Sequence, residues 1–546
     1  MPKPITRNTL YYGDNLDILR EYIPDESVDL IYLDPPFNSN RSYSVLFKDE
    51  KGMDSEAQIN AFDDTWHWNE RVFRSLIASA PLHVASMLDA MHGFIGENQM
   101  MAYLVMMAAR LVELHRVLKP TGSLYLHCDP TASHYLKVLL DTIFGVQNYL
   151  NEIVWKRTTS HNDPQRYGRI GDRILFYSKS TKKVFIRGGG DYSEEQLKRY
   201  KFEDSKGRYR AENLTAPHFS ETRTIVWKGT HPGLNRQWRY SIQELDRLYS
   251  EGKILLKDDG TPRKDGLKEY LCEAKGQPFQ DIWTDIPFPP TTAERLGYPT
   301  QKPLALLERI IQASSNPGDV VLDPFSGCGT AIAAAQKLGR QWIGVDITHL
   351  AIAMHKSRLK DMYGLLPEKD YDVVGEPVDL NGAKALFKQN PFQFESWAVS
   401  LMSARPQGGN TTDRKKQVGD RGIDGVILFT EDARGRTGKI IIQVKGGGVK
   451  SGDVRDLRGV IERESAAMGI FLTLEAPSRE MKLEADKAGD YHSELWQMDY
   501  PRLQIVTIED LLDGRRPDLP RWLDDPHKKA ERVKGKEGDG QLGLEM

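Results

Sequence analysis

Apolar runs of strand length alternate with stretches of helical periodicity over the first two-thirds of the chain. The run at residues 28–33 predicts a strand that ends at Asp34, and a long helical region follows as far as about Leu118. A turn over residues 119–122 leads into the later elements. The further predicted strands are 123–127, 151–156, 173–178, 320–322 and 342–345, and the later predicted helices are 304–313 and 330–338. Such alternation is typical of an α/β fold that is doubly wound around a mostly parallel sheet.

Between about residues 188 and 290 this periodicity breaks up, and Gly, Pro, Arg, Tyr and Trp become frequent. We interpret this stretch as an inserted module. The whole chain has a net charge of −3, but residues 151–240 hold 19 Lys and Arg against 10 Asp and Glu. Phosphate binding needs a local positive potential rather than a basic chain, so this excess is compatible with nucleic acid. A solvated surface that is basic by chance explains the count equally well.

The last third of the chain predicts a second, smaller α/β domain. Residues 362–390 are polar and predict a linker, residues 391–514 predict the second domain, and residues 515–546 form a polar tail. The Lys- and Glu-rich end of this tail, after Trp522, has the composition of a disordered segment. The chain as a whole has a globular composition, with 39% hydrophobic and 28% charged residues.

Cellular location is predicted from three features of the sequence. The scattered cysteines Cys128, Cys272 and Cys328 match neither a disulfide framework nor a zinc site, and they fit a reducing cytoplasm. No charged segment followed by an apolar run begins the chain, so we predict no signal peptide. The most apolar stretch, residues 100–112, is short and contains Arg110, so we expect a buried helix and no membrane association.

A strand, a glycine-containing turn and a helix start follow one another at residues 321–330. The small residues of this turn allow backbone N–H groups to approach a ligand at the helix N-terminus. Asp346 ends the next predicted strand, where a carboxylate can accept hydrogen bonds from both hydroxyls of a ribose. The turn lacks Gly-x-Gly-x-x-Gly spacing, and the chain has no phosphate-loop lysine. These features predict a nucleoside cofactor, and a simple tight connection between strand and helix is the alternative.

The tetrapeptide Asp34-Pro35-Pro36-Phe37 comes directly after the strand at 28–33. It therefore lies at the carboxyl edge of the predicted sheet, where open α/β folds bind ligands. The Asp34 side chain and the Pro35 carbonyl offer two acceptors for the two N–H bonds of an amine. The prolines stiffen the loop, and Phe37 can stack on a planar ring. The alternative is that the tetrapeptide is only a rigid turn.

These two segments, in this order, resemble the β class of DNA amino-methyltransferases over roughly residues 8–360. Asp-Pro-Pro-Phe matches the catalytic motif of that family, and Asp-Pro-Phe-Ser-Gly-Cys-Gly-Thr at 323–330 matches its S-adenosylmethionine loop. The family's segments around Asp14 and Lys302 also fall in the expected places. The resemblance implies a Rossmann-like methyltransferase fold with a catalytic half at 1–187, a target-recognition insert at 188–290 and a cofactor-binding half at 291–361.

The resemblance further implies methyl transfer from S-adenosylmethionine to an exocyclic nitrogen of double-stranded DNA, with the target base flipped out of the duplex. Acceptance of both N–H bonds by Asp34 and Pro35 would draw the nitrogen toward tetrahedral geometry and free its lone pair for in-line attack. Aspartate at the first motif position resembles the adenine N6 enzymes, whereas cytosine N4 enzymes more often have serine. The implied cofactor residues are Asp14, Asp34, Lys302, Asp323, Pro324, Phe325, Ser326, Gly327, Gly329, Thr330 and Asp346.

In the second domain, residues 422–429 and 439–445 predict two strands joined by a Gly-rich hairpin loop. Gln443 and Lys445 are two apart, so both point to one face of a strand, and Asp424 on the adjacent strand would converge with them. Asp424 and Gln443 could then hold Mg²⁺, while Lys445 orients a water for attack on phosphate. The pattern resembles the Mrr-like branch of the PD-(D/E)xK nucleases, in which Glu395, on a preceding helix, corresponds to an auxiliary site residue. A structural strand with a polar face is the alternative.

The leading interpretation is a single-chain restriction–modification enzyme that methylates a specific sequence and cuts DNA lacking the mark. One alternative is a methyltransferase, for adenine N6 or cytosine N4, whose rear domain binds DNA without cleaving it. A nucleotide-dependent oxidoreductase would leave Asp-Pro-Pro-Phe and the nuclease-like strands unexplained. The sequence leaves open the recognition site and the oligomeric state, for which a homodimer is one option.

Overall fold

A computed structural model of the protein describes residues 4–36, 68–159, 165–190, 192, 194–274, 276–288, 294–296, 298, 300–406, 422–432 and 436–520, and the backbone alone of 42–48 and 54–63. The chain divides into two compact units. One unit is Arg187–Gln280, and the other comprises Met1–Ile186 and Asp281–Met546. The insert predicted at 188–290 overlaps the first of these units.

A nine-stranded sheet forms the centre of the larger unit, with the strand order β16-β6-β7-β5-β2-β17-β18-β1-β19. Only β7 runs antiparallel to its neighbours β5 and β6, and the other neighbouring pairs are parallel. The sheet is therefore mixed and mostly parallel. Its strands are β1 Thr9–Tyr12, β2 Val28–Leu33, β5 Leu118–Cys128, β6 Tyr149–Lys156, β7 Gly171–Ser178, β16 Ile282–Trp283, β17 Val320–Asp323, β18 Gln341–Asp346 and β19 Asp372–Val374.

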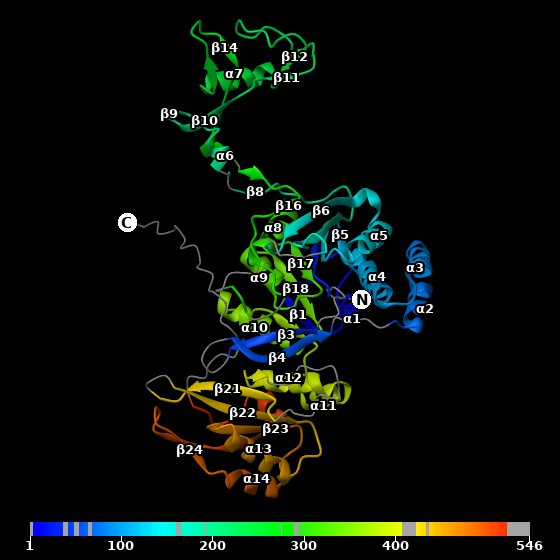
Figure 1. Ribbon diagram of the computed structural model, residues 1–546, viewed down its shortest axis with the longest axis vertical. Coiled ribbons are helices and arrows are strands. Elements are labelled where there is room, and N and C mark those ends of the chain that lie inside the picture. The colour runs from blue at the N-terminus through cyan, green and yellow to red at the C-terminus, as the bar shows by residue number, and fades with distance from the viewer. Residues whose placement is uncertain are drawn as a thin grey trace, which may run out of the picture. The chain divides into compact units, whose positions relative to one another are not determined.

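Helices cover both faces of this sheet, as a doubly wound fold requires (Figure 1). Ile31 and Leu33 of β2 pack with helices on one face, and Leu30 and Tyr32 pack with those on the other. Alternate side chains of a strand point to opposite faces, so a strand buried on both sides reads as one continuous apolar run. The first layer contains α1 Asn15–Tyr22, α3 Leu82–Ile95, α4 Gln99–Val117 and α5 Ser133–Phe144, and the second contains α8 Leu304–Ser314, α9 Thr330–Lys337 and α10 His349–Tyr363.

The prediction of one long helical region up to Leu118 is wrong. A hairpin of β3 Ser42–Lys48 and β4 Asp54–Asp63 comes first, and α2 Glu70–Ser79, α3 and α4 follow it as separate helices. Pro81 directly precedes α3, and Gly96 ends it with a φ of 76°. These two residues interrupt a helical pattern that is otherwise continuous, because proline is suited to a helix start and glycine to a helix end.

Two further predictions also need correction. The turn predicted at 119–122 lies inside β5, where the register against β2 shifts between the pairs Val28–Leu118 and Leu30–Ser123. The linker predicted at 362–390 contains β19, which pairs with β1, and helix α11 Leu380–Gln389. A strand as short as β19 gives no readable alternation of apolar and polar residues.

The unit Arg187–Gln280 has a small core of its own. Trp227, Trp238 and Leu245 are buried together in it, the last on helix α7 Ile242–Ser250. A four-stranded sheet in the order β13-β14-β10-β9 accompanies this core. Its strands are β9 Phe202–Asp204, β10 Gly207–Glu212, β13 Ile254–Leu256 and β14 Pro262–Tyr270. The insert is therefore a folded module, although its short strands made the sequence appear irregular.

The C-terminal region contains a five-stranded sheet in the order β20-β21-β22-β23-β26. The strands are β20 Arg405–Pro406, β21 Gly425–Thr430, β22 Thr437–Lys445, β23 Met468–Thr473 and β26 Leu503–Thr507. Its helices include α12 Pro391–Leu401, α13 Ser451–Arg463, α14 Arg479–Asp486 and α15 Ile508–Leu512. The predicted tail beyond residue 520 lies outside the described residues. Within the described part of the chain, no helix is long and apolar enough to cross a bilayer.

We expect Leu322→Ala to destabilise the larger unit by about 2–5 kcal/mol, because Leu322 is completely buried in the central strand β17 and its loss leaves a cavity. Urea unfolding followed by tryptophan fluorescence measures the change. Val146→Ala is the control, since Val146 is 69% exposed. Equal shifts of the unfolding midpoint in the two variants would contradict this description of the core.

Candidate active site

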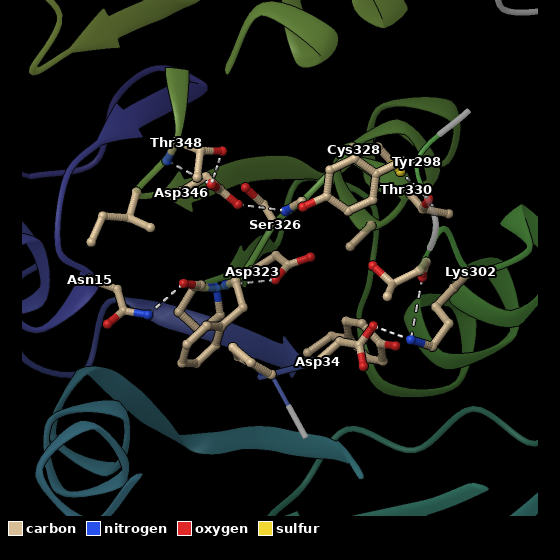
Figure 2. A pocket seen from close by; sticks show the side chains of 18 of the residues that line it. Asn15, Asp34, Tyr298, Lys302, Asp323, Ser326, Cys328, Thr330, Asp346 and Thr348 are labelled. Carbon is tan, nitrogen blue, oxygen red and sulfur yellow. Dashed lines mark hydrogen bonds and ion pairs between the residues drawn. The ribbon is translucent and has the colours of Figure 1, made fainter. Parts of the chain in front are cut away.

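Three neighbouring strands of the central sheet lead to acidic residues around one cavity. β2 runs directly into Asp34, β17 ends at Asp323 and β18 ends at Asp346. Because the three strands are parallel neighbours, their carboxyl ends lie at the same edge of the sheet. The cavity has a volume of about 350 Å³, which lies in the range of small-molecule sites. Figure 2 shows Asp346 and Thr348 on one side of it and Asp34 and Lys302 on the other.

Nearly all of the predicted cofactor residues line this cavity. They are Asp14, Asp34, Lys302, Asp323, Pro324, Phe325, Ser326, Gly327, Thr330 and Asp346. Gly329 is not among the lining residues, and its φ of 78° lies in the left-handed region that favours glycine. A Cβ atom at Gly329 would lie 3.0 Å from the His355 ring, so this glycine allows the chain to turn closely against α10.

The tetrapeptide predicted to be catalytic lies only in part within the described residues. Asp34 and Pro36 line the cavity, and Pro35 between them is buried. Phe37, which we predicted to stack on a base, lies outside the described residues.

Hydrogen bonds fix the loop at 323–330 against the end of β18. The Ser326 backbone N–H donates to the Val345 carbonyl at 3.0 Å, and the Gly327 N–H donates to Asp346 Oδ2 at 2.9 Å. Behind the loop, the buried Arg358 side chain donates to the Thr330 hydroxyl at 3.0 Å. These hydrogen bonds hold the loop in one conformation against the end of β18.

Asp346 has both of its carboxylate oxygens engaged. Oδ1 accepts from the backbone N–H and the hydroxyl of Thr348, at 2.9 and 2.8 Å, and Oδ2 accepts from Gly327. Burial raises the pKa of Asp346 to about 6, because these hydrogen bonds offset only part of the cost of a desolvated charge. Each carboxylate oxygen has a further lone pair, so the side chain can still accept from a ligand hydroxyl.

Asp34 forms an ion pair with the Lys302 ammonium group, which comes from the segment before α8 (Figure 2). Asp323 lies close by, is 3% exposed, and has its pKa raised well above the ordinary value by burial. With Asp14 and Asp346, the cavity is therefore lined by four carboxyl groups, and Lys302 is directly paired with Asp34. The sequence analysis assigned Lys302 to the cofactor site. In the structure, its ammonium group also forms the ion pair that orients the Asp34 side chain.

Asp14 is held by an arginine that the sequence analysis did not assign to the site. Arg110 Nη2 lies 2.8 and 2.9 Å from the two Asp14 carboxylate oxygens, and its Nε donates to Asn15 Oδ1. Asn15 in turn donates to the Pro324 carbonyl at 2.7 Å, which ties this group to the cofactor loop. A charged residue in the otherwise apolar run at 100–112 was the available signal for Arg110. Tyr298 also lines the cavity and was missed, and no sequence pattern marked it.

In the C-terminal sheet, Asp424 lies directly before β21, beside Gln443 of the antiparallel neighbour β22. The Asp424 N–H donates to the Ile442 carbonyl at 2.9 Å, and its Oδ2 accepts from the Val444 N–H at 2.6 Å. Lys445 is the last residue of β22, and Glu395 lies on α12 as predicted. The strands thus bring Asp424, Gln443 and Lys445 to one end of the hairpin. The auxiliary role of Glu395, which belongs to a separate element, stays a prediction.

Comparison with known proteins identifies the larger part of the chain. Residues 28–356 match the family model for the DNA methylases of the N6/N4 methyltransferase type. The Type II methyltransferase M.EcaI of Enterobacter cloacae is 30% identical over 374 residues, covering 67% of this chain and 72% of its own. The DNA adenine methyltransferase YhdJ of Escherichia coli K12 is 26% identical and covers 64% of this chain and 82% of its own. TTHA0409 from Thermus thermophilus, solved in complex with S-adenosyl-L-methionine, is 18% identical with a TM-score of 0.34, covering 68% of this chain and 99% of its own.

The C-terminal region matches a different model. Residues 405–513 correspond to the family described as NACHT-associated inactive Restriction Endonuclease 1. This match supports a restriction-endonuclease-like domain, and its description gives no support to cleavage. The amino-methyltransferase family predicted from the two motifs is confirmed. Since the first model spans more than half of the sequence, the chain belongs to the DNA methylase family of N6/N4 methyltransferases.

Proposed function

We propose that the protein transfers a methyl group from S-adenosylmethionine to the N6 atom of adenine within a specific sequence of double-stranded DNA. The observation that supports this most directly is the shared cavity, which both Asp34 with Pro36 and the loop at 323–330 line. A donor that binds against the loop therefore lies next to the carboxylate that would hold the target amine.

The residues of the cavity fit this donor. Gly327 has a φ of 48°, and a Cβ atom there would stand 3.3 Å from the Tyr298 ring, so glycine keeps space open at the loop. Asp346 can accept from the ribose hydroxyls of the donor. Asp14, which is held by Arg110, lines the same cavity and in this proposal contacts the adenine ring of the donor. When bound, S-adenosylmethionine supplies an electrophilic methyl group on a sulfonium. In this proposal Lys302 also contacts the bound S-adenosylmethionine, in addition to forming its ion pair with Asp34.

The catalytic loop prepares the nucleophile. The lone pair of an exocyclic amine is delocalised into the ring, so the nitrogen reacts poorly as it stands. The Asp34 carboxylate accepts one N–H bond and the Pro35 carbonyl accepts the other, which favours the tetrahedral nitrogen. The ion pair with Lys302 orients the Asp34 side chain before the base arrives.

Two findings favour adenine, with DNA as the substrate. Aspartate stands at the first motif position, and a DNA adenine methyltransferase is among the similar proteins. The unit Arg187–Gln280 is the candidate for target recognition, because it is a separately folded module within the basic, aromatic-rich part of the chain. Base flipping gives the cavity access to an amine that is otherwise buried in the duplex.

We expect Asp34→Ala to lower the rate of methylation about 100-fold or more, because one of the two groups that hold the amine is lost. Incubation of DNA with methyl-labelled donor, digestion to nucleosides and chromatography measure the product. Asp25→Ala is the control, since the Asp25 side chain is 75% exposed before the same strand. Labelled N4-methylcytosine in place of N6-methyladenine would contradict the base assignment, and full activity of the Asp34 variant would contradict the site.

Donor affinity should fall as the pH drops through about 6. The pKa of Asp346 is raised to about 6 by burial, and only the ionised carboxylate accepts two ribose hydroxyls. At pH 7 about nine-tenths of this group is ionised and at pH 5 about one-tenth, so the apparent affinity should weaken about tenfold between them. Calorimetry at the two pH values tests this, with Asp346→Asn as the comparison. The variant should bind weakly with little pH dependence, and an unchanged pH dependence would assign it to another group.

Metal-dependent DNA cleavage by the C-terminal domain is a second candidate function. One observation favours it. Gln443 is 8% exposed, and within the described residues its Oε1 atom has no hydrogen-bond partner, although it lies beside Asp424. A buried carbonyl oxygen without a partner is costly, and a divalent cation shared with Asp424 would satisfy it. The family description favours the alternative, a domain that binds DNA without cutting it.

Unmethylated DNA incubated with the full chain and Mg²⁺ should give defined fragments. Asp424→Ala and Lys445→Ala should each abolish the fragments and leave methylation unchanged, because the two sites are on different sheets. Gel electrophoresis and the methylation assay on the same preparations measure both. Cleavage retained in both variants would refute these site residues, and no cleavage by the unaltered chain would contradict the nuclease function.

A further inference from the structure

A row of buried polar side chains crosses three adjacent strands beneath the cavity. The Tyr32 hydroxyl on β2 lies 3.0 Å from His127 Nδ1 on β5, and His127 Nε2 lies 3.1 Å from Asp172 Oδ2 on β7. Tyr32 and Asp172 are 2% exposed and His127 is completely buried. The order of groups, hydroxyl then imidazole then carboxylate, is the order used by serine hydrolases to move a proton.

One end of this row opens on the active site. Tyr32 lines the same cavity as Asp34 and stands two residues before it, so the two side chains point to the same side of β2. His127 and Asp172 do not line the cavity themselves, and the Tyr32 hydroxyl connects them to it. A buried polar row is a costly way to fill a core that apolar residues fill elsewhere. Because this row is costly to bury and one end of it opens on the cavity, we infer that it serves the active site rather than the packing of the core.

We propose that Tyr32, His127 and Asp172 form the relay that accepts the proton released by the methylated amine, an inference that rests on the proposed function. Methyl transfer leaves the amine nitrogen positively charged with one surplus proton. That proton moves to the Tyr32 oxygen while the Tyr32 hydroxyl proton moves to His127 Nδ1. The nitrogen keeps the bonding pair and becomes neutral, and His127 becomes an imidazolium. After the product leaves, the proton returns through Tyr32 to water in the open cavity.

Asp172 has the position of the group that stabilises this imidazolium. It accepts from His127 Nε2, which selects the imidazole tautomer whose Nδ1 can take a proton from Tyr32. Burial alone would raise the pKa of Asp172, but the hydrogen bond with His127, together with the Arg157 guanidinium at 3.4 Å and Lys302, lowers it overall. The carboxylate thus stays ionised, as the relay requires. The carboxyl groups of Asp34, Asp323 and Asp172 lie near Tyr32, and together with burial they raise the pKa of its hydroxyl well above the ordinary value.

The test compares two buried tyrosines of the same core. Tyr32→Phe removes the hydroxyl at the head of the relay. Tyr125→Phe is the matched control, because Tyr125 on β5 is equally buried and its hydroxyl contacts Ser314 at 2.7 Å instead. Single-turnover methylation is measured from pH 6 to 9, and donor affinity is measured by calorimetry. We expect Tyr32→Phe to slow methylation about 100-fold with unchanged donor affinity, and Tyr125→Phe to stay within about twofold of the unaltered chain.

A second variant, Asp172→Asn, tests the far end of the relay. Asp172 acts on the substrate proton only through His127 and Tyr32, without touching the substrate itself. Loss of the carboxylate removes the stabilisation of the imidazolium, so the rate should fall and the low-pH limb of the pH–rate profile, where His127 must be neutral to accept the proton, should move to lower pH. Equal rates for the two tyrosine variants, or a slower Asp172→Asn with an unmoved pH profile, would overturn the relay. Failure of the unaltered chain to methylate adenine would contradict the proposed function itself, and that result is obtained before any variant is compared.

Discussion

The parallel register of β2, β17 and β18 is the constraint on which the site depends. It brings Asp34, Asp323 and Asp346, which are far apart in the sequence, to one edge of the sheet. Three carboxyl groups around one cavity repel one another, and desolvation adds to that cost. The protein reduces it in two ways. Burial raises the pKa of Asp323 well above its ordinary value, which favours its neutral form, and the Lys302 ammonium group pairs with Asp34.

The antiparallel strand β7 also brings an acidic residue to this edge of the central sheet. β7 is antiparallel to β5, so the start of β7 lies at the edge where β5 and β2 end. Asp172 is the second residue of β7 and His127 is the last but one of β5, which places them side by side. In a purely parallel sheet the strand at this position would bring its carboxyl end here instead. The antiparallel strand thus supplies an acidic group at the active edge from its own beginning.

Much of this could be predicted from the sequence, because strands buried on both faces read as apolar runs and the residues that follow them mark the active edge. The strand before Asp34, the loop at 323–330 and the strand ending at Asp346 were all recognised in this way. The short β19 was missed because three residues are too few to show an alternation. The hairpin β3–β4 was missed because its residues were assigned to the single helical region predicted before Leu118. Arg110 and the Tyr32–His127–Asp172 row were missed for another reason. Their partners come from different strands and helices, and one sequence gives no sign of which distant residues will meet.

The way in which the unit Arg187–Gln280 leaves and rejoins the chain has an evolutionary consequence. Gly189–Gly190 pairs with Gln277–Pro278 as a two-stranded ribbon, so the two ends of the unit lie together. Just past the second end, β16 adds an edge strand to β6 of the main sheet. The unit has its own apolar core, and its two ends are paired with each other. A unit of this kind can be replaced by another of different length without disturbing the main sheet. With the proposed role of this unit in target recognition, exchange of the module would change the sequence preference and leave the residues around Asp34 unchanged.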